Sequence, residues 1–194
     1  MINHLFQLTG PGRFRVKFED VDISDGVVVR PVYLSICAAD QRYYTGQRGQ
    51  EILRRKLPMA LIHEAAGEVV FDNDGIFKPG DRVFLVPNLP SAKDDYIAEN
   101  YLYSSKFRAS SLDGFMQEFV KMPHDRLVSC EGIIPEIASF GELLSVAMHA
   151  VNTFLSKSHG RRETIGIWGD GNLGTRLPFC CGSSCPRPGL SYWE

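Results

Sequence analysis

Short apolar runs separated by turn-forming residues dominate roughly the first 125 residues of the chain, and this pattern predicts short β-strands. Residues 26–34, 66–71, 82–87 and 117–122 are apolar runs rich in Val and Phe, and the turn-forming residues 72–75 follow the second of them. Because helical patterns separate few of these strands, we expect an antiparallel, barrel-like first domain that is mainly β with short helices.

The apolar period changes at Pro135 to three and four residues, which predicts an amphipathic helix over about 136–154. Residues 47–56 are polar and predict a loop or a short helix. After a polar connector, residues 164–168 predict a short buried strand that ends in a glycine-rich turn. The pattern therefore divides the chain into a first domain over 1–150, linked by the helix to the start of a second over 161–174.

Residues 175–194 do not continue this second domain. The part from 175 to 189 holds three prolines and two glycines and has no apolar stripe at helical spacing. Each proline inside a helix costs about 3 kcal/mol. We expect residues 175–194 to be a disordered or foreign tail, of the kind that a shifted reading frame produces.

Composition and charge exclude several classes of partner. The chain has 194 residues, of which 44% are hydrophobic, and a net charge of −2. A balance this close to neutral argues against nucleic acid or an anionic membrane surface as a partner. No apolar run reaches the roughly 18 residues of a membrane span, and residues 1–4 do not resemble a signal peptide. Five cysteines, an odd number, do not form a disulfide framework, so we expect a cytoplasmic protein.

Four residues have side chains that suit a metal site: Cys37, His63, Glu64 and Glu142. Thiolate, imidazole and carboxylate groups bind zinc, and a catalytic zinc needs three protein ligands with one position left open. Each residue alone also has an ordinary interpretation, since a lone Cys is often buried as a small hydrophobe and a His-Glu pair is often on the surface. The residue types by themselves leave both interpretations open.

A glycine motif follows the last predicted strand. Residues 169–174 fit the pattern G-x-G-x-x-G, whose glycines permit a tight turn and a close approach of backbone N–H groups to a pyrophosphate. A ribose-reading residue is expected about 20 positions further on, which falls in the predicted tail, so these residues do not distinguish NAD from NADP. The candidate cofactor-binding residues are Gly169, Gly171, Asn172, Leu173 and Gly174.

Residues 34–40, 61–70 and 77–83 resemble, in order and spacing, the medium-chain zinc alcohol dehydrogenases. Residues 142–150 are similar to the third-ligand segment of the polyol-dehydrogenase branch. The resemblance covers residues 1–174. It implies a GroES-like barrel that carries zinc, followed by a Rossmann domain of which this chain holds only the start.

The resemblance assigns roles to the candidate metal residues. It implies that Cys37 and His63 are zinc ligands. Glu64 is a ligand in the polyol branch and a supporting carboxylate elsewhere, and Glu142 either binds the zinc or holds its water. Asp40 matches the aspartate that orients the ligand histidine.

Two departures from the family pattern change the expected chemistry. Ala39 stands where many members have a Ser or Thr that relays a proton, which leaves Glu64 as the candidate for general acid/base work. Residues 86–119 contain no cysteine, whereas many members hold a structural zinc there with four cysteines. We therefore expect one catalytic zinc.

A cationic and aromatic cluster begins a few residues after Cys37. The cluster is either a solvated loop or a substrate contact, and the forked donors of arginine suit a phosphate. We take Arg42 and Tyr44 as candidate substrate-binding residues. The further cations of the cluster are Arg48, Arg54, Arg55 and Lys56.

Residues 35–46, 94–101 and 113–117 are similar to the ribulose-5-phosphate reductases. This resemblance implies reduction of ribulose 5-phosphate to ribitol 5-phosphate with NADPH, for CDP-ribitol and teichoic acid or capsule synthesis. It also implies a cytidylyltransferase partner. A second copy of the chain is another candidate partner, because the helix near 137–151 would leave apolar surface uncovered.

Two alternatives to an active reductase remain: a truncated homologue without dehydrogenase activity, and a partner-binding module without catalysis. Members of the family are roughly twice as long, and a single strand with its turn cannot form a cofactor domain. We expect this chain to bind zinc, but neither to bind NADPH measurably nor to turn over ribulose 5-phosphate.

Overall fold

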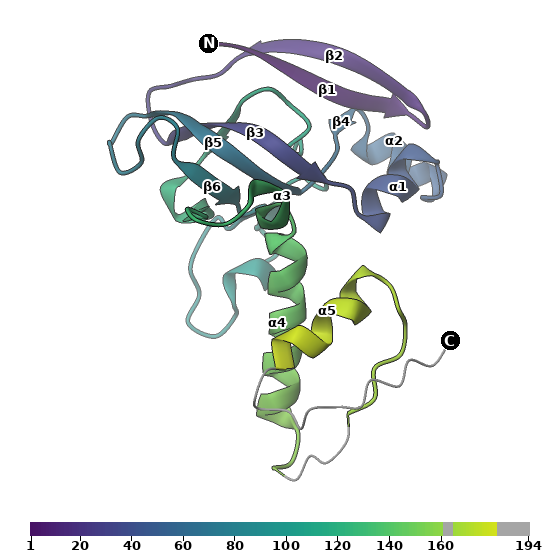
Figure 1. Ribbon diagram of the computed structural model, residues 1–194. Coiled ribbons are helices and arrows are strands. Elements are labelled where there is room, and N and C mark those ends of the chain that lie inside the picture. Colours follow the sequence, from purple (N-terminus) through teal and green to yellow (C-terminus); the bar gives the residue numbers. More distant parts are fainter. Residues whose placement is uncertain (161–164, 182–194) are drawn as a thin grey trace. The chain divides into compact units, whose positions relative to one another are not determined.

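The structure, a computed structural model, describes residues 1–160 and 165–181 (Figure 1). The chain divides into two compact units, Met1–Phe140 and Gly141–Glu194, and each is described by itself. Within the described ranges, every helix is too short or too polar to cross a bilayer.

The first unit is built from short strands. Three antiparallel sheets have the strand orders β2-β1-β4, β10-β6-β5-β3-β9 and β7-β8. This confirms the predicted antiparallel, mainly β architecture. The strands are β1 (Ile2–Gly10), β2 (Arg13–Asp20), β3 (Val27–Ser35), β4 (Met59–Ala60), β5 (Glu64–Asp72), β6 (Arg82–Leu85), β7 (Asn88–Leu89), β8 (Lys106–Phe107), β9 (Val120–Met122) and β10 (Leu127–Ser129).

The core of this unit lies against the five-stranded sheet. β-branched residues favour the pleated conformation, and those of β3 and its neighbours are buried side by side. Fully buried Phe115 packs among them from the loop before β9. A second cluster, under α1 and β4, holds Leu8, Tyr43, Met59, Leu61 and Ile62.

Short helices complete the first unit. They are α1 (Ala38–Tyr44), α2 (Gln50–Lys56) and α3 (Pro135–Ala138), with 3-10 turns at Glu99–Tyr101 and His124–Arg126. Of the two possibilities for residues 47–56, the structure therefore shows a short helix.

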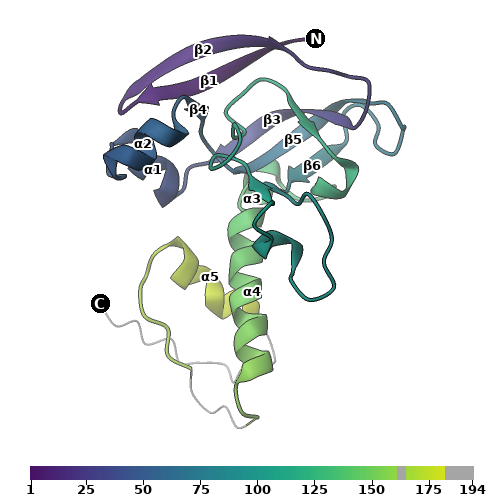
Figure 2. The ribbon, with the colours of Figure 1, turned by 180° about the vertical axis from the view of Figure 1, so that it is seen from behind.

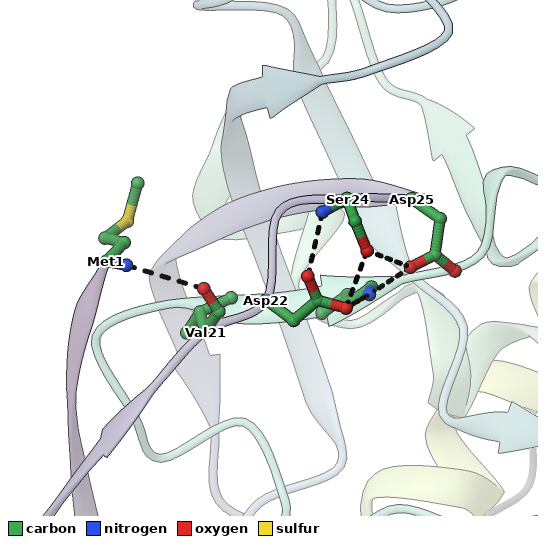
Figure 3. A network of polar contacts seen from close by, with 6 residues as sticks. Met1, Val21, Asp22, Ser24 and Asp25 are labelled. Carbon is green, nitrogen blue, oxygen red and sulfur yellow. Dashed lines mark hydrogen bonds and ion pairs between the residues drawn. The ribbon is translucent and has the colours of Figure 1, made fainter.

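The connection between β2 and β3 is held by a polar network (Figure 3). Asp22 accepts hydrogen bonds from the backbone and the hydroxyl of Ser24, each at 2.9 Å. Lys121 of β9 forms ion pairs with Asp22, at 2.9 Å, and with Asp25. The hydrogen bond from Lys121 and those from Ser24 lower the pKa of Asp22. The network thus attaches the segment between β2 and β3 to strand β9.

The sequence predicted one helix over about 136–154. The structure has two helices in this region instead. Helix α3 ends at Ala138, and α4 (Gly141–Lys157) begins after a break at residues 139–140. The hydroxyl of Ser139 donates to the carbonyl of Glu136 at 2.7 Å and lies 3.1 Å from the hydroxyl of Ser35 in β3. These contacts favour a helix end at Ser139, which periodicity does not reveal.

The second unit differs from the prediction at two places. Residues 165–168 are not a strand, and Trp168 is 82% exposed. A strand of a parallel sheet needs neighbouring strands, and α4 and α5 (Asn172–Cys181) are the elements that the structure describes in this unit.

Helix α5 corrects the first part of the predicted tail. It begins at the glycine motif, as that motif requires, but continues through Pro178 to Cys181. Helices α4 and α5 pack against each other (Figures 1 and 2), and such packing can outweigh the cost of one proline. The remaining parts of the predicted strand and tail, 164 and 182–194, lie outside the described residues.

Candidate metal centre

Antiparallel pairing of β3 with β5 brings Cys37 and His63 together. Cys37 lies two residues beyond the end of β3, and His63 immediately precedes β5. In the ladder Ser35 is opposite Glu64, so the end of one strand meets the start of the other. Sγ of Cys37 lies 3.7 Å from Nε2 of His63.

This distance fits two ligands of one zinc ion. Zn–S and Zn–N bonds of about 2.3 and 2.0–2.1 Å, joined at a tetrahedral angle, place the two ligand atoms about 3.6 Å apart. Burial, together with the neighbouring Asp40 carboxylate, raises the pKa of the Cys37 thiol to about 11. A bound divalent cation has the opposite effect, because a coordinating thiol is deprotonated.

Asp40 fixes the backbone at both candidate ligands. Its carboxylate is buried, with the residue 4% exposed. Oδ2 accepts from the backbone N–H of Cys37 and lies 3.1 Å from both that nitrogen and Sγ. Oδ1 accepts from the N–H of Ile62 at 2.9 Å. Asp40 thus binds the backbone of the residue before His63, and one of its carboxylate oxygens lies within 4.8 Å of a ring nitrogen of the histidine; that it orients the histidine, as the resemblance implies, stays a prediction.

Ile62 has an unusual backbone conformation directly before His63. Its φ of 72° lies in the left-handed region, which β-branched residues rarely adopt. Its N–H donates to Asp40, and its carbonyl accepts from the N–H of Phe115 at 2.7 Å. Strain of this kind persists where the surroundings fix the backbone. Here it sets the direction in which the chain enters His63.

Gly114 supports the same loop from behind. A Cβ atom at this position would lie 2.2 Å from the carbonyl oxygen of Leu61 and 2.3 Å from that of Ile62. Only glycine therefore permits the observed approach. Sequence reasoning missed both Ile62 and Gly114, since neither contributes a side chain that could bind a metal.

Glu64 and Phe107 are the next neighbours of His63. Glu64 opens β5 and is 4% exposed, and one of its carboxylate oxygens lies within 4.8 Å of a ring nitrogen of His63. The ring of Phe107, from β8, lies 5.4 Å from the imidazole. The sequence predicted the place of Glu64 but not that of Phe107, because β8 is separated from His63 by more than 40 residues.

Glu142 lies in the first turn of α4, in the second unit. Its predicted role, binding zinc or holding the water on it, stays a prediction.

The glycine motif has the local geometry that its pattern predicts. Gly169 has a φ of 103°, which only glycine adopts readily, and a Cβ at Gly174 would lie 2.1 Å from the carbonyl oxygen of Gly169. Asn172 and Leu173 form the first turn of α5. The tight turn into a helix N-terminus is therefore present, and cofactor binding by these residues stays a prediction.

The two candidate substrate residues lie on α1. Arg42 is exposed in its last turn. Tyr44 is 48% exposed, and its ring stacks on Phe14 of β2 with the ring centres 6.0 Å apart. The structure thus places Tyr44 against the β1–β2 hairpin, and substrate binding by either residue stays a prediction.

Comparison with known proteins adds independent information. Residues 24–134 match the family described as alcohol dehydrogenase GroES-like domain. Ribulose-5-phosphate reductase 1 of Staphylococcus aureus is 57% identical over 176 residues, which are 90% of this chain and 52% of that protein. Ribulose-5-phosphate reductase of Bacillus spizizenii is 54% identical over the same shares of the two chains.

A crystal structure of a related protein is similar to this chain in both fold and sequence. The crystal structure of S. aureus TarJ in complex with NADPH has a TM-score of 0.74 and 45% sequence identity, and the match covers 93% of this chain and 50% of that one. The chain therefore spans about half the length of the relatives that it matches.

Proposed function

Since the chain belongs to the family with an alcohol dehydrogenase GroES-like domain, we propose that it holds one catalytic zinc and forms the zinc-binding part of an NADPH-dependent ribulose 5-phosphate reductase. The observation that carries the metal is the 3.7 Å separation of Cys37 Sγ and His63 Nε2. The substrate and NADPH are supported by the names of relatives that are 54–57% identical and by the NADPH complex of TarJ.

Different residues of this chain would position the metal ligands and supply the proton for reduction of the ketone. Zinc, when bound, supplies Lewis-acid polarisation of the ketone carbonyl. Asp40 holds the two ligand loops through the amides of Cys37 and Ile62. Ala39 has no proton to give, so Glu64, buried next to His63, is the residue of this chain that would supply a proton to the ketone oxygen, and NADPH, when bound, would supply the hydride.

Metal analysis with two cysteine variants tests the zinc site. We expect the purified chain to retain one equivalent of zinc and the Cys37→Ser variant to lose it. Cys130→Ser is the matched control, because Cys130 is likewise a free cysteine but is buried in the small cluster with Ala66 and Ala138. Equal zinc content in wild type and Cys37→Ser would refute the proposed centre.

A second candidate function is zinc binding without hydride transfer in this chain. The observation that favours it is Trp168, which is 82% exposed at the position where a nucleotide-binding fold buries its first strand. Calorimetric titration with NADPH distinguishes the two candidates. Micromolar binding with oxidation of NADPH by ribulose 5-phosphate supports the reductase, and zinc without NADPH binding supports the second candidate.

We also propose a cellular compartment and partners for this protein. A reductase of this kind would act in the cytoplasm on a sugar phosphate and yield ribitol 5-phosphate for CDP-ribitol, next to a cytidylyltransferase and a second copy of itself. The resemblance of residues 35–46 to the ribulose-5-phosphate reductases supports this assignment. Co-purification of the two enzymes from cells is the corresponding test.

A further inference from the structure

A groove of about 490 Å³ opens between the C-terminal end of α2 and the turn after β8. Its polar lining comes from Arg55 and Lys56 on one side and from Ser110, Ser111 and Asp113 on the other. A groove that gathers cationic and hydroxyl donors in this way is suited to an anion with several oxygen acceptors.

The cations of the groove are not neutralised by carboxylates. Arg30, Lys121 and Arg126 form ion pairs with carboxylates. In the described part of the chain, by contrast, no carboxylate lies within 4.0 Å of Arg55 or Lys56. Lys56 donates instead to the backbone carbonyl of Ser110. The positive charge on this side of the groove therefore remains available to a ligand.

Asp113 is the acidic residue of the groove, and other donors already occupy its carboxylate. Both of its oxygens accept from Nε2 of Gln7 at 3.1 Å, and one also accepts from the N–H of Ala60 at 2.6 Å. These bonds hold Asp113 against β1 and β4, so its carboxylate is directed at Gln7 and Ala60 and forms no ion pair with Arg55 or Lys56. Arg55 and Lys56 outweigh it within the groove.

The groove lies next to the candidate metal centre. One wall is formed by residues 110–113, and the carbonyl of Phe107 accepts from the N–H groups of Ser110 and Ser111 at 3.2 and 2.9 Å. Phe107 in turn places its ring 5.4 Å from the ring of His63. The segment 107–113 therefore connects the residues that line the groove to the neighbourhood of the imidazole.

We propose that this groove binds the phosphate group of the substrate, with Arg55, Lys56 and the hydroxyl of Ser110 as donors. The inference rests on the proposed function and deepens it by assigning the phosphate monoester a site. It moves this role from Arg42 and Tyr44, the residues that the sequence favoured, to the end of α2. Arginine supplies a fork of donors and lysine a point charge, a combination that fits a phosphate dianion.

Binding to the purified chain, followed by NMR or calorimetry, tests the groove without any need for zinc or NADPH. The ligands are ribulose 5-phosphate, free ribulose and inorganic phosphate. We expect saturable binding of both phosphates, tighter for ribulose 5-phosphate, and no binding of ribulose at the same concentrations. Arg55→Ala should weaken the binding of both phosphates about 10- to 150-fold, since it removes one charge-assisted contact.

Arg54→Ala is the matched control, because Arg54 has the same charge on the same helix but does not line the groove. We expect a change of less than about twofold for this variant, since an exposed charge outside a site contributes little. Ser110→Ala should weaken binding while leaving the thermal unfolding midpoint unchanged. This second variant separates the site from a general effect of charge.

Three results would overturn the proposal: equal losses in Arg54→Ala and Arg55→Ala, a loss in Arg42→Ala but not in Arg55→Ala, or inorganic phosphate binding as tightly as ribulose 5-phosphate. Absence of saturable phosphate binding would overturn it as well. Zinc content measured on the same samples keeps this outcome distinct from a failure of the proposed function.

Discussion

Asp40→Asn is the sharpest perturbation of the candidate metal centre, because it keeps the shape of the side chain but replaces one acceptor oxygen by an NH₂ group and removes the charge. The carboxylate accepts one backbone N–H on each oxygen, from Cys37 at 3.1 Å and from Ile62 at 2.9 Å. In asparagine one of these oxygens becomes an NH₂ group. Whichever way the amide turns, one backbone N–H then faces a donor and loses its acceptor.

The size of the effect follows from burial. A hydrogen bond to a charged group contributes about 1.5–3 kcal/mol, and a buried N–H left without a partner costs about 1–3 kcal/mol. Removal of a buried charge offsets part of this loss. We therefore expect the free energy of unfolding of Asp40→Asn to fall by about 2–4 kcal/mol, since Asp40 is 4% exposed. Groups that orient metal ligands typically change metal affinity 10- to 100-fold, so zinc affinity should fall by a similar factor.

Urea unfolding and competition with a zinc chelator measure the two effects. Asp94→Asn is the control, because Asp94 also accepts two backbone N–H groups, from Tyr96 at 2.8 Å and Ile97 at 2.9 Å, but is exposed. Its substitution should change the free energy of unfolding far less than Asp40→Asn does, because solvent screens an exposed carboxylate. If Asp40→Asn unfolds and binds zinc like the control, the argument that Asp40 clamps both loops is refuted.

Three further substitutions test the supports of the fold. Gly114→Ala should lower the unfolding midpoint and the zinc affinity together, because its Cβ would lie 2.2 Å from the carbonyl of Leu61; unchanged values in both assays would contradict this. Phe115→Ala should cost about 3–5 kcal/mol in urea unfolding, since the ring is fully buried, and a loss below 1 kcal/mol would show that the core collapses around it. Burial raises the pKa of Asp72, but hydrogen bonds from two backbone amides and from His124 outweigh it and lower that pKa from 3.8 to about 2. The lowered pKa stabilises the folded state fully above pH 3.8, and this stabilisation is lost as the pH falls through about 2. Asp72→Asn should therefore be less stable than wild type at pH 7 and equally stable near pH 2. Unfolding midpoints measured across this pH range check the prediction.

Local patterns of the sequence were sufficient for the elements that depend on neighbours in the chain. Runs rich in β-branched residues, bounded by turn-forming residues, predicted β3 and β5, because these side chains favour the extended backbone of a strand. The same holds for the turn at Gly169–Gly174, where φ and close approach restrict the positions to glycine. The residue types of Cys37 and His63 likewise marked a candidate zinc site, since few side chains bind that metal.

Tertiary contacts determined what local patterns could not. The break at Ser139 depends on the hydroxyl of Ser35, more than 100 residues away, and the length of α5 depends on packing against α4. The separation of 3.7 Å between Cys37 and His63 arises from the register of two strands, and the clamp by Asp40 depends on the backbone of Ile62. Such contacts join residues that are distant in the sequence, and their energies are decided by burial and geometry, which a one-dimensional pattern does not contain.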